Sequence, residues 1–386
     1  MNQSIRRLLP ILALTVFCSN LGSGIIAPLL PVYAKELGAN GFWLGVIFSG
    51  SSIASAVLMP FAGRFSDKHG RKLMLAFGLL GYALMSFAYA WAHSIGSLLA
   101  VRLVQGAAAA MVSPISQAYI GDITPPGQEG KWMGIYNATF VIGFGSGPLL
   151  GGVVSDHFSM NTAFYIMGIL NFISFLSVLI FLPEIKERKQ SVAQFSFKDI
   201  TRSDITRGIF SFQLGSSADR GIMTTFIPVF GVALLGLNTS LIGTVLTVTI
   251  VINSLLQIPA GRLADRFNRK ILIMIGSLGL VIHMLVLPLS NGFWLLLFLL
   301  IVGAIFDAAS ALPAVAAIVQ EGRKYGMGVT TSVSMMGQGL GMGLAPIIAG
   351  AIVDATNVRF AFYVAAAITL IAGLGFVYST RKVARI

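Results

Sequence analysis

Long apolar runs separated by short polar segments make up almost the whole chain. A helix needs about 20 apolar residues to cross the hydrocarbon core of a bilayer, and helices satisfy their own backbone groups there. The pattern therefore predicts an all-α membrane protein with twelve transmembrane helices. The predicted spans are 8–33, 42–63, 73–91, 95–120, 131–155, 161–182, 208–234, 240–261, 271–289, 293–318, 326–353 and 360–379.

The start of the chain has two features of a secretory signal, namely basic residues and an apolar run. Arg6 and Arg7 precede the run, but no small-residue cleavage site follows, and the run continues through Pro28. We therefore expect it to be the first span.

Composition supports the same class of protein. Apolar residues make up 56% and charged residues 10%, with a mean hydropathy of +0.85, whereas soluble chains average about 25% charged residues. Too few residues remain outside the spans for a sizeable catalytic domain, so we expect no enzyme. The single cysteine, Cys18, excludes a disulfide framework, and His283 has no second ligand at metal-binding spacing. We expect no metal site.

The net charge of +12 reflects how basic residues are distributed along the chain. If both termini are cytosolic, 22 of the 26 Lys and Arg residues fall in cytosolic segments. Lys35 and Arg359 lie outside, and Arg102 and Arg220 lie within spans. Positive charge on the cytosolic side is what sets membrane orientation. The charge therefore indicates topology and contact with lipid headgroups, and we expect no nucleic-acid partner.

An internal repeat occurs at an offset of 198 to 199 residues. The segment 63–72 recurs as 261–270, and 163–165 recurs as 361–363. Six spans used twice give two parallel six-helix pseudo-repeats, because an even number of spans returns the chain to the side it started from. We predict an N-terminal half at 1–183, a cytosolic linker at 184–207 and a C-terminal half at 208–386.

Three motifs resemble those of the major facilitator superfamily. The Gly-x-x-x-Asp-x-x-Gly-Arg-Lys loop at 63–72 is similar to the family signature between spans two and three. The segment 102–106, Arg-Leu-Val-Gln-Gly, resembles the fourth-span motif of proton-coupled members. The segment 143–152 resembles the fifth-span motif of exporters that exchange drug for proton. The resemblance covers essentially the whole chain and implies a drug–proton antiporter.

The signature loop and its second copy carry charges that we assign to gating. A carboxylate near a positive helix end gains roughly 0.3 to 1 kcal/mol, and Arg71 and Lys72 could pair with Asp122 at the end of span four. Such pairs would close one side of the transporter and break when it opens. The alternative is a solvated turn whose charges only set topology. The predicted gating residues are Gly63, Asp67, Arg71, Lys72, Asp122, Asp265, Arg269 and Glu321.

A row of glycines in span five is the predicted hinge. Gly143, Gly147 and Gly151 recur every four residues on one helix face, with Pro148 and Gly152 beside them. Small residues at this spacing let two helix backbones approach closely. Ordinary tight packing is the alternative for any single glycine.

Four charged residues lie within predicted spans, namely Arg102, Asp219, Arg220 and Asp307. Each costs about 2.5 to 3.5 kcal/mol at mid-span, so such residues face a bundle interior or an aqueous cavity. A low-dielectric cavity favours the neutral form of a carboxylate, which can then bind and release a proton. We assign proton coupling to Asp307, Asp219 and Arg102, and favour Asp307 because no cation adjoins it in sequence. Alternatively, Asp219 forms a structural ion pair with Arg220 or Arg102.

An acidic residue in span seven and an Asp in span ten also resemble the pattern of quinolone-type multidrug exporters. Polar residues near mid-span are candidates for the wall of a substrate cavity, although each could instead form an interhelical hydrogen bond. These candidates are Asn20, Gln105, Tyr136, Asn137, Arg220, Asn253, Gln257 and Gln338.

Together these features predict a secondary active transporter of a plasma or bacterial inner membrane. We expect it to export lipophilic, cationic drug-like compounds in exchange for protons by alternating access, as a monomer with no cofactor except the coupling protons. An alternative is transport of a sugar, metabolite or organic anion, with Arg102 and Arg220 as anion ligands. An intramembrane aspartyl protease is disfavoured because 304–307 lacks its Gly-x-Gly-Asp motif. A non-transporting receptor on the same scaffold is a further alternative.

Overall fold

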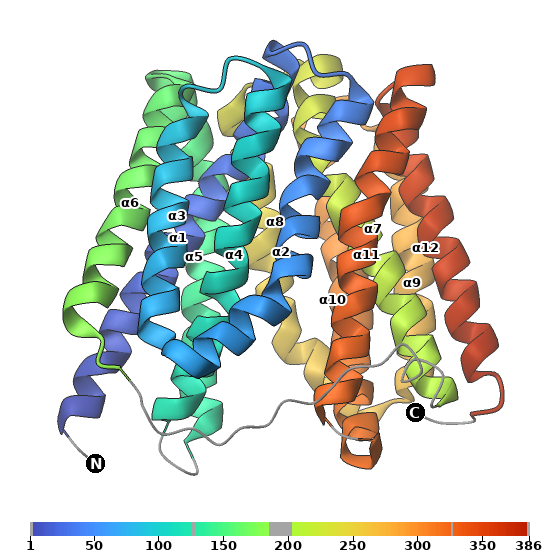
Figure 1. The fold of residues 1–386 in the computed structure, drawn as a ribbon. Coiled ribbons are helices and arrows are strands. Elements are labelled where there is room, and N and C mark those ends of the chain that lie inside the picture. Colours follow the sequence, from blue (N-terminus) through green and yellow to red (C-terminus); the bar gives the residue numbers. More distant parts are fainter. Residues whose placement is uncertain (1–2, 125–127, 185–202, 326, 384–386) are drawn as a thin grey trace. The chain divides into compact units, whose positions relative to one another are not determined.

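The computed structural model describes residues 3–124, 128–184, 203–325 and 327–383 (Figure 1). Within these ranges twelve helices are long and apolar enough to cross a membrane, and no strand occurs. The twelve predicted spans and the all-α class are thus confirmed. Most of the predicted linker, residues 185–202, lies outside the described residues. The helices are α1 (Gln3–Glu36), α2 (Gly41–His69), α3 (Arg71–Tyr89), α4 (Ile95–Ile123), α5 (Glu129–His157), α6 (Met160–Phe181), α7 (Asp204–Leu235), α8 (Thr239–Arg266), α9 (Arg269–Val286), α10 (Phe293–Tyr325), α11 (Met327–Ala355) and α12 (Arg359–Thr380), with a short 3₁₀ helix, η2 (Leu287–Leu289), after α9.

The chain forms two compact units. Unit 1 comprises Met1–Gly38, Gly50–Gln190 and Asn238–Thr247, and unit 2 comprises Ala39–Ser49, Ser191–Leu237 and Val248–Ile386. Unit 1 therefore contains the start of α8, and unit 2 contains the start of α2. The remainder of each of these helices belongs to the other unit. Sequence repetition alone did not suggest this exchange of helix starts. The half boundaries at 183 and 208 stay a prediction.

Close backbone contacts shape unit 1. A Cβ added to Gly143 or Gly151 would lie 2.6 Å from the Phe17 carbonyl or 2.4 Å from the Ile25 carbonyl, both on α1. Only glycine lets α5 approach α1 this closely. The row predicted as a hinge forms a packing seam in this structure, and its role as a hinge stays a prediction. A hydrophobic core beside it includes Leu12, Val16, Leu75, Ile115 and Tyr119.

Unit 2 is built around α7. Its side chains Ile209 and Phe212 are buried with Ile273 of α9, Ala317 of α10 and Phe376 of α12. Gly341 of α11 gives the same kind of close approach as the α5 glycines, because an added Cβ would lie 2.3 Å from the Leu214 carbonyl. The centre of α7 is consequently held in place from several sides.

Two aspartates that correspond to each other in the repeat anchor helix starts. In unit 2, Asp354 at the end of α11 accepts hydrogen bonds from the backbone N–H groups of Gly41 and, at 2.9 Å, Phe42 at the start of α2. In unit 1, Asp156 at the end of α5 accepts from the Thr239 hydroxyl and, at 2.8 Å, from the Ser240 N–H at the start of α8. The first N–H groups of a helix have no partner within it, so a carboxylate there satisfies them and the helix dipole.

Candidate functional site

A cluster of charged and polar side chains occupies the interior of unit 2. Arg220 on α7 lies with its Nη1 atom 3.9 Å from the Oδ1 atom of Asp307 on α10. Asn253 on α8 donates from Nδ2 to the Asp307 Oδ2 atom at 3.0 Å and, over 3.3 Å, to the Ala304 carbonyl. The structure therefore brings together three residues that sequence analysis had assigned to two different tasks, coupling and cavity wall.

Asp219 is the most enclosed carboxylate of this cluster. Asp219 is only 3% exposed, and its Oδ1 atom has no hydrogen-bond partner among the described residues. A buried polar atom without a partner costs free energy, so such an atom is a candidate for a functional role.

The structure corrects one premise about the two carboxylates. Asp307 was favoured as proton carrier because no cation adjoins it in sequence, whereas Arg220 pairs with Asp307 in space and forms no ion pair with Asp219 within the described part of unit 2. Successive helix residues point about 100° apart, which lets Asp219 face the packed interior while Arg220 reaches α10. In this structure Arg220 is thus within ion-pair distance of Asp307 and not of Asp219, and the alternative of a structural ion pair between Asp219 and Arg102 stays untested.

Unit 1 has a cationic network instead. Gln105 on α4 is 5% exposed, and its Oε1 atom accepts from the Tyr89 hydroxyl at 2.5 Å and from Arg102 Nη1 at 2.9 Å. The Gln105 carbonyl is thus already engaged by two donors. Gln105 joins α3 to α4 and orients Arg102, so the hydrogen-bond alternative describes it better than a cavity wall.

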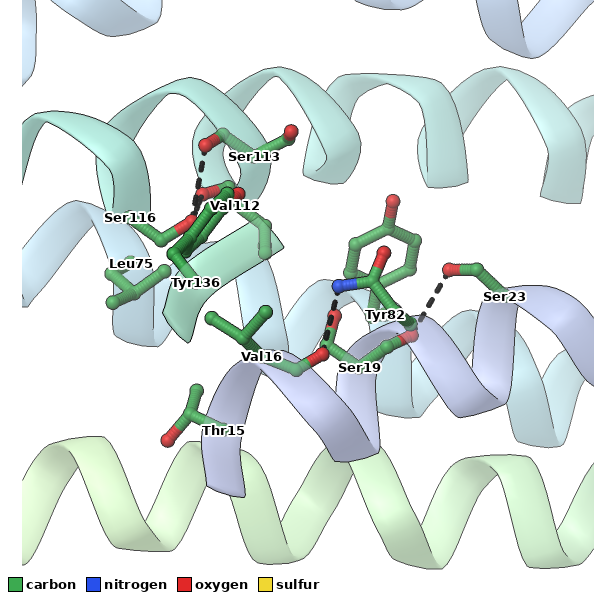
Figure 2. Close-up of a pocket in the computed structure, with 11 residues that line it drawn as sticks. Thr15, Val16, Ser19, Ser23, Leu75, Tyr82, Val112, Ser113, Ser116 and Tyr136 are labelled. Atoms are coloured by element: carbon green, nitrogen blue, oxygen red, sulfur yellow. Dashed lines mark hydrogen bonds between the residues drawn. The ribbon is translucent and has the colours of Figure 1, made fainter. Parts of the chain in front are cut away.

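A small cavity lies inside unit 1 between α1, α3, α4 and α5 (Figure 2). Its volume of about 30 Å³ has room for about two water molecules, at roughly 10–15 Å³ each. Two predicted wall residues, Asn20 and Tyr136, line it. Sequence analysis missed its hydroxyl groups, although their spacing of four in α1 could have indicated a shared face. These hydroxyl residues are Thr15, Ser19, Ser23, Tyr82, Ser113 and Ser116.

Hydrogen bonding decides what this cavity presents to a guest. Thr15 donates its hydroxyl to the Ile11 carbonyl, Ser23 to Ser19, and Ser116 to Val112, all within their own helices. A hydroxyl whose one proton is already donated in a hydrogen bond can only accept further hydrogen bonds. The cavity wall is therefore rich in acceptors, which suits water or another small donor.

The other predicted wall residues do not join these sites. Asn137 is exposed within unit 1 and does not line its cavity, and Gln257 and Gln338 are exposed within unit 2. A place for these three residues in the wall of a substrate cavity stays a prediction.

The signature loop contains the ion pair that its charges suggested. Arg71 Nε lies 2.5 Å from Asp122 Oδ2, and Nη2 donates to Oδ1 at 3.2 Å, while Asp67 lies 3.9 Å from Arg71. Gly70, directly before the first residue of α3, has φ at +112°, a conformation that glycine adopts without strain. Lys72 and Gly63 are not part of this ion pair, and a gating role for the loop stays a prediction.

The charged residues of the second copy of the loop make different contacts. Arg269 donates to the Gln320 Oε1 atom at 2.8 Å, and Glu321 accepts from Ser203 at 2.5 Å and pairs with Lys324 at 3.4 Å. Asp265 is exposed. The repeat thus preserves the residue pattern without preserving the arginine–carboxylate pair.

Comparison with known proteins gives consistent matches over nearly the whole chain. The Major Facilitator Superfamily model matches residues 12–253 and 209–385. An uncharacterised MFS-type transporter of Methanocaldococcus jannaschii is 25% identical over 94% of this chain and 95% of its own. The quinolone resistance protein NorA of Staphylococcus aureus is 26% identical over 93% of both chains.

Solved structures show the same fold at lower identity. A bacterial homologue of the human lysosomal transporter Spinster, in an inward-facing and unoccupied conformation, superimposes with a TM-score of 0.85 at 14% identity, covering 99% of this chain and 98% of that one. The nucleoside transporter NupG gives 0.77 at 18% identity, covering 99% and 100%. At these identities the likeness concerns the fold alone.

Proposed function

Since the chain belongs to the major facilitator superfamily and is a membrane transporter, we propose that it exports lipophilic cationic compounds in exchange for protons. The observation that carries this proposal is the Asp219–Arg220–Asp307 cluster inside a membrane-spanning bundle. Similarity to NorA, a quinolone resistance protein, over 93% of the chain supports export of a drug-like compound.

The chemistry of the cluster suits exchange. An ionised Asp307 attracts Arg220 or, when that contact loosens, a cationic substrate, whereas a protonated Asp307 attracts neither strongly. Proton and cation therefore compete for the same carboxylate. Exchange then requires only that the transporter switches between its inward-open and outward-open conformations after either one binds. Asp219, buried without a partner on Oδ1, supplies a second site where a proton can reside.

The energetics predict which gradient drives the process. Moving one elementary charge across the membrane is worth about 2.3 kcal/mol per 100 mV. A monovalent cation exchanged for one proton moves no net charge, so the membrane potential cancels and the pH gradient alone supplies the work. We expect both termini to be cytosolic, from the distribution of basic residues.

Transport of a sugar or another neutral polar metabolite remains the second class, because the unit 1 cavity is lined by hydroxyl groups (Figure 2). Its volume of about 30 Å³ accommodates about two waters rather than a sugar ring. The observation thus favours internal hydration over sugar binding.

Purified protein in proteoliposomes with an imposed pH gradient tests the proposal. Lipophilic cations, sugars and organic anions are supplied in parallel, and accumulation against the substrate gradient is measured with and without a proton ionophore. We expect only the cations to accumulate, and the ionophore to abolish their accumulation. Sugar uptake down its own gradient, indifferent to pH, would contradict proton-coupled export.

A further inference from the structure

Glu321 is a buried carboxylate near the end of α10, outside the Asp219–Arg220–Asp307 cluster. It is only 1% exposed, and both of its oxygens have partners. Oε2 accepts a hydrogen bond from the Ser203 hydroxyl at 2.5 Å, and Oε1 lies 3.4 Å from the Lys324 Nζ atom. A hydroxyl–carboxylate hydrogen bond of about 2.5–2.7 Å is among the stronger kinds. Burying a carboxylate is costly unless it is paired and hydrogen-bonded, so Glu321 depends on these contacts.

Ser203 connects this carboxylate to the first turn of α7. It is the N-cap residue of that helix, and its hydroxyl oxygen accepts from the Thr206 N–H at 3.0 Å while its proton is donated to Glu321. The first N–H groups of a helix have no partner within it, so such a cap fixes where the helix begins. The Ser203–Glu321 bond therefore joins the start of α7 to α10.

This bond and the Arg220–Asp307 contact link α7 to α10 at two places. Ser203 lies 17 residues before Arg220, and Glu321 lies 14 residues after Asp307. At 1.5 Å per residue the two links are about 26 Å apart along α7 and about 21 Å apart along α10. The reversed order means that the two helices run antiparallel, and the similar lengths mean that they lie alongside each other between the links.

Between the two links the contact is apolar. Ile209 and Phe212 of α7 are buried with Ala314 and Ala317 of α10. Apolar burial is non-directional, so these side chains do not by themselves fix one register between the helices. A short hydrogen bond to a carboxylate holds two particular atoms together. The Ser203–Glu321 bond is therefore well suited to set the register of α7 against α10.

The second copy of the signature loop leaves Glu321 available for this bond. Arg269 donates to Gln320 instead, and successive helix residues point about 100° apart, so Gln320 can face α9 while Glu321 faces α7. In unit 1 the corresponding carboxylate, Asp122, is paired with Arg71. The two copies thus use this acidic position for different contacts.

We propose that Ser203 and Glu321 form a permanent latch that sets the register of α7 against α10 and so places Arg220 opposite Asp307. Glu321 is then a positioning residue, and not a gating residue whose contact opens and closes. The inference rests on the proposed function in one respect, which is the importance that it gives to Arg220 and Asp307.

Hydrogen–deuterium exchange of the full chain in lipid vesicles tests whether the latch holds α7. In Glu321→Ala the Ser203 hydroxyl loses its acceptor on α10, and we expect the amides of 205–210 to exchange at least about ten times faster, the scale of one hydrogen bond to a charged group. Glu321→Gln, which keeps the length but not the charge, should give a smaller increase if the alanine variant fails to fold. In a Ser203→Ala background, Glu321→Ala should add little, because both changes remove the same bond.

Lys324→Gln is the matched control, because it removes the other partner of the same carboxylate. Lys324 is 57% exposed, and exposed ion pairs contribute little, so exchange at 205–210 should change by less than about twofold. Exchange that is unchanged in folded Glu321→Ala and Glu321→Gln, or that rises as much in Lys324→Gln, would overturn the latch.

A thiol cross-link tests whether the latch is permanent. Cys18 is the only cysteine in the sequence, so Cys18→Ser gives a background in which Ser203→Cys and Glu321→Cys can be joined by a short bifunctional methanethiosulfonate. Accumulation of ethidium, a lipophilic cation, is driven by an imposed pH gradient and measured before and after cross-linking. We expect accumulation to fall several-fold in the uncross-linked pair and to recover on cross-linking.

Two outcomes of the cross-link would contradict a permanent latch. Accumulation that stays low or stops on cross-linking would show that the contact must open during the cycle. Full accumulation in the uncross-linked pair would show that Arg220 and Asp307 do not depend on it. If the Cys18→Ser background itself does not accumulate ethidium, the proposed export function fails, and hydrogen exchange at 205–210 still decides the latch.

Discussion

Unit 2 holds Asp219, Arg220 and Asp307 inside its bundle, whereas the repeat-related stretches of unit 1, Asn20–Gly22 and Ala107–Ala110, carry no charge. Unit 1 instead holds one cation, Arg102, with Gln105. By contrast, the aspartates that anchor helix starts occur in both units. Features that folding requires are expected to recur in both repeats, and features needed for transport need occur only once. On this reasoning we assign the charges of unit 2 to the proposed transport cycle and the anchoring aspartates to folding, and the experiments below test both assignments.

Removing the titratable group from unit 2 should have the largest effect. Asp307→Asn keeps size and hydrogen bonding but cannot bind and release a proton, so it should abolish accumulation driven by a pH gradient. Glu36→Gln, which removes an exposed carboxylate at the end of α1, is the control and should retain accumulation. The measurement is uptake of a lipophilic cation into proteoliposomes. Accumulation preserved in Asp307→Asn would leave Asp219 as the remaining membrane carboxylate of unit 2.

Asp219→Asn separates function from stability within the same cluster. Because Asp219 forms no ion pair and its Oδ1 atom no hydrogen bond within the described part of unit 2, an isosteric neutral amide should change the free energy of unfolding by less than about 1 kcal/mol. Driven accumulation should nevertheless fall if the two carboxylates share the proton. Thermal unfolding in detergent and transport are measured on the same preparation. A loss of about 3 kcal/mol or more, typical of breaking a buried ion pair, would instead make Asp219 structural.

The sequence predicted the helices and the repeat because each depends on local composition. Twelve apolar runs of spanning length form helices in lipid because only helices satisfy their own backbone groups there. The Arg71–Asp122 pair was suggested because Arg71 lies in the signature loop and Asp122 lies at the end of the fourth predicted span, although the two residues are 51 apart in sequence. The partner of Asn253 depended instead on the rotation of α8 against α10, which packing decides. The same uncertainty left Gln105 as a cavity candidate until its two donors, Tyr89 and Arg102, were located.

Gly147 of α5 lies at a position where the two units differ in residue, and alanine variants can test whether they also differ in packing. An added Cβ at Gly147 would lie 2.5 Å from the Gly24 Cα atom, whereas one at Gly63 would meet nothing within 4 Å. Gly147→Ala should therefore destabilise unit 1 by about 1–3 kcal/mol through overpacking. Gly63→Ala should stabilise α2 by roughly 0.5–1 kcal/mol because it restricts the unfolded chain. Unit 2 already has alanine at the equivalent position, Ala345, so an unaffected Gly147→Ala would show that the seam is equally open in both.

Asp354 and Asp156, which anchor helix starts, are a feature that the two units share, and their substitution is expected to have the smallest effect. Asp354→Ala leaves the Gly41 and Phe42 N–H groups without their acceptor and should cost about 0.5–2 kcal/mol of stability, as for other lost helix caps. Asp156→Ala should cost a similar amount, because Asp156 makes the equivalent contacts to Thr239 and Ser240.

Asparagine variants of the same two residues show how much of this effect is charge. An amide oxygen still accepts a hydrogen bond but loses the attraction of a carboxylate for the positive helix end, worth about 0.3–1 kcal/mol. Asp354→Asn and Asp156→Asn should therefore fall between wild type and the alanine variants in thermal unfolding, and the loss in the asparagine variants should shrink with added salt. A large loss at one aspartate and none at the other would mean that the repeat conserves the residue without conserving its role, as already happens for the arginine of the signature loop, where Arg71 pairs with Asp122 but Arg269 contacts Gln320.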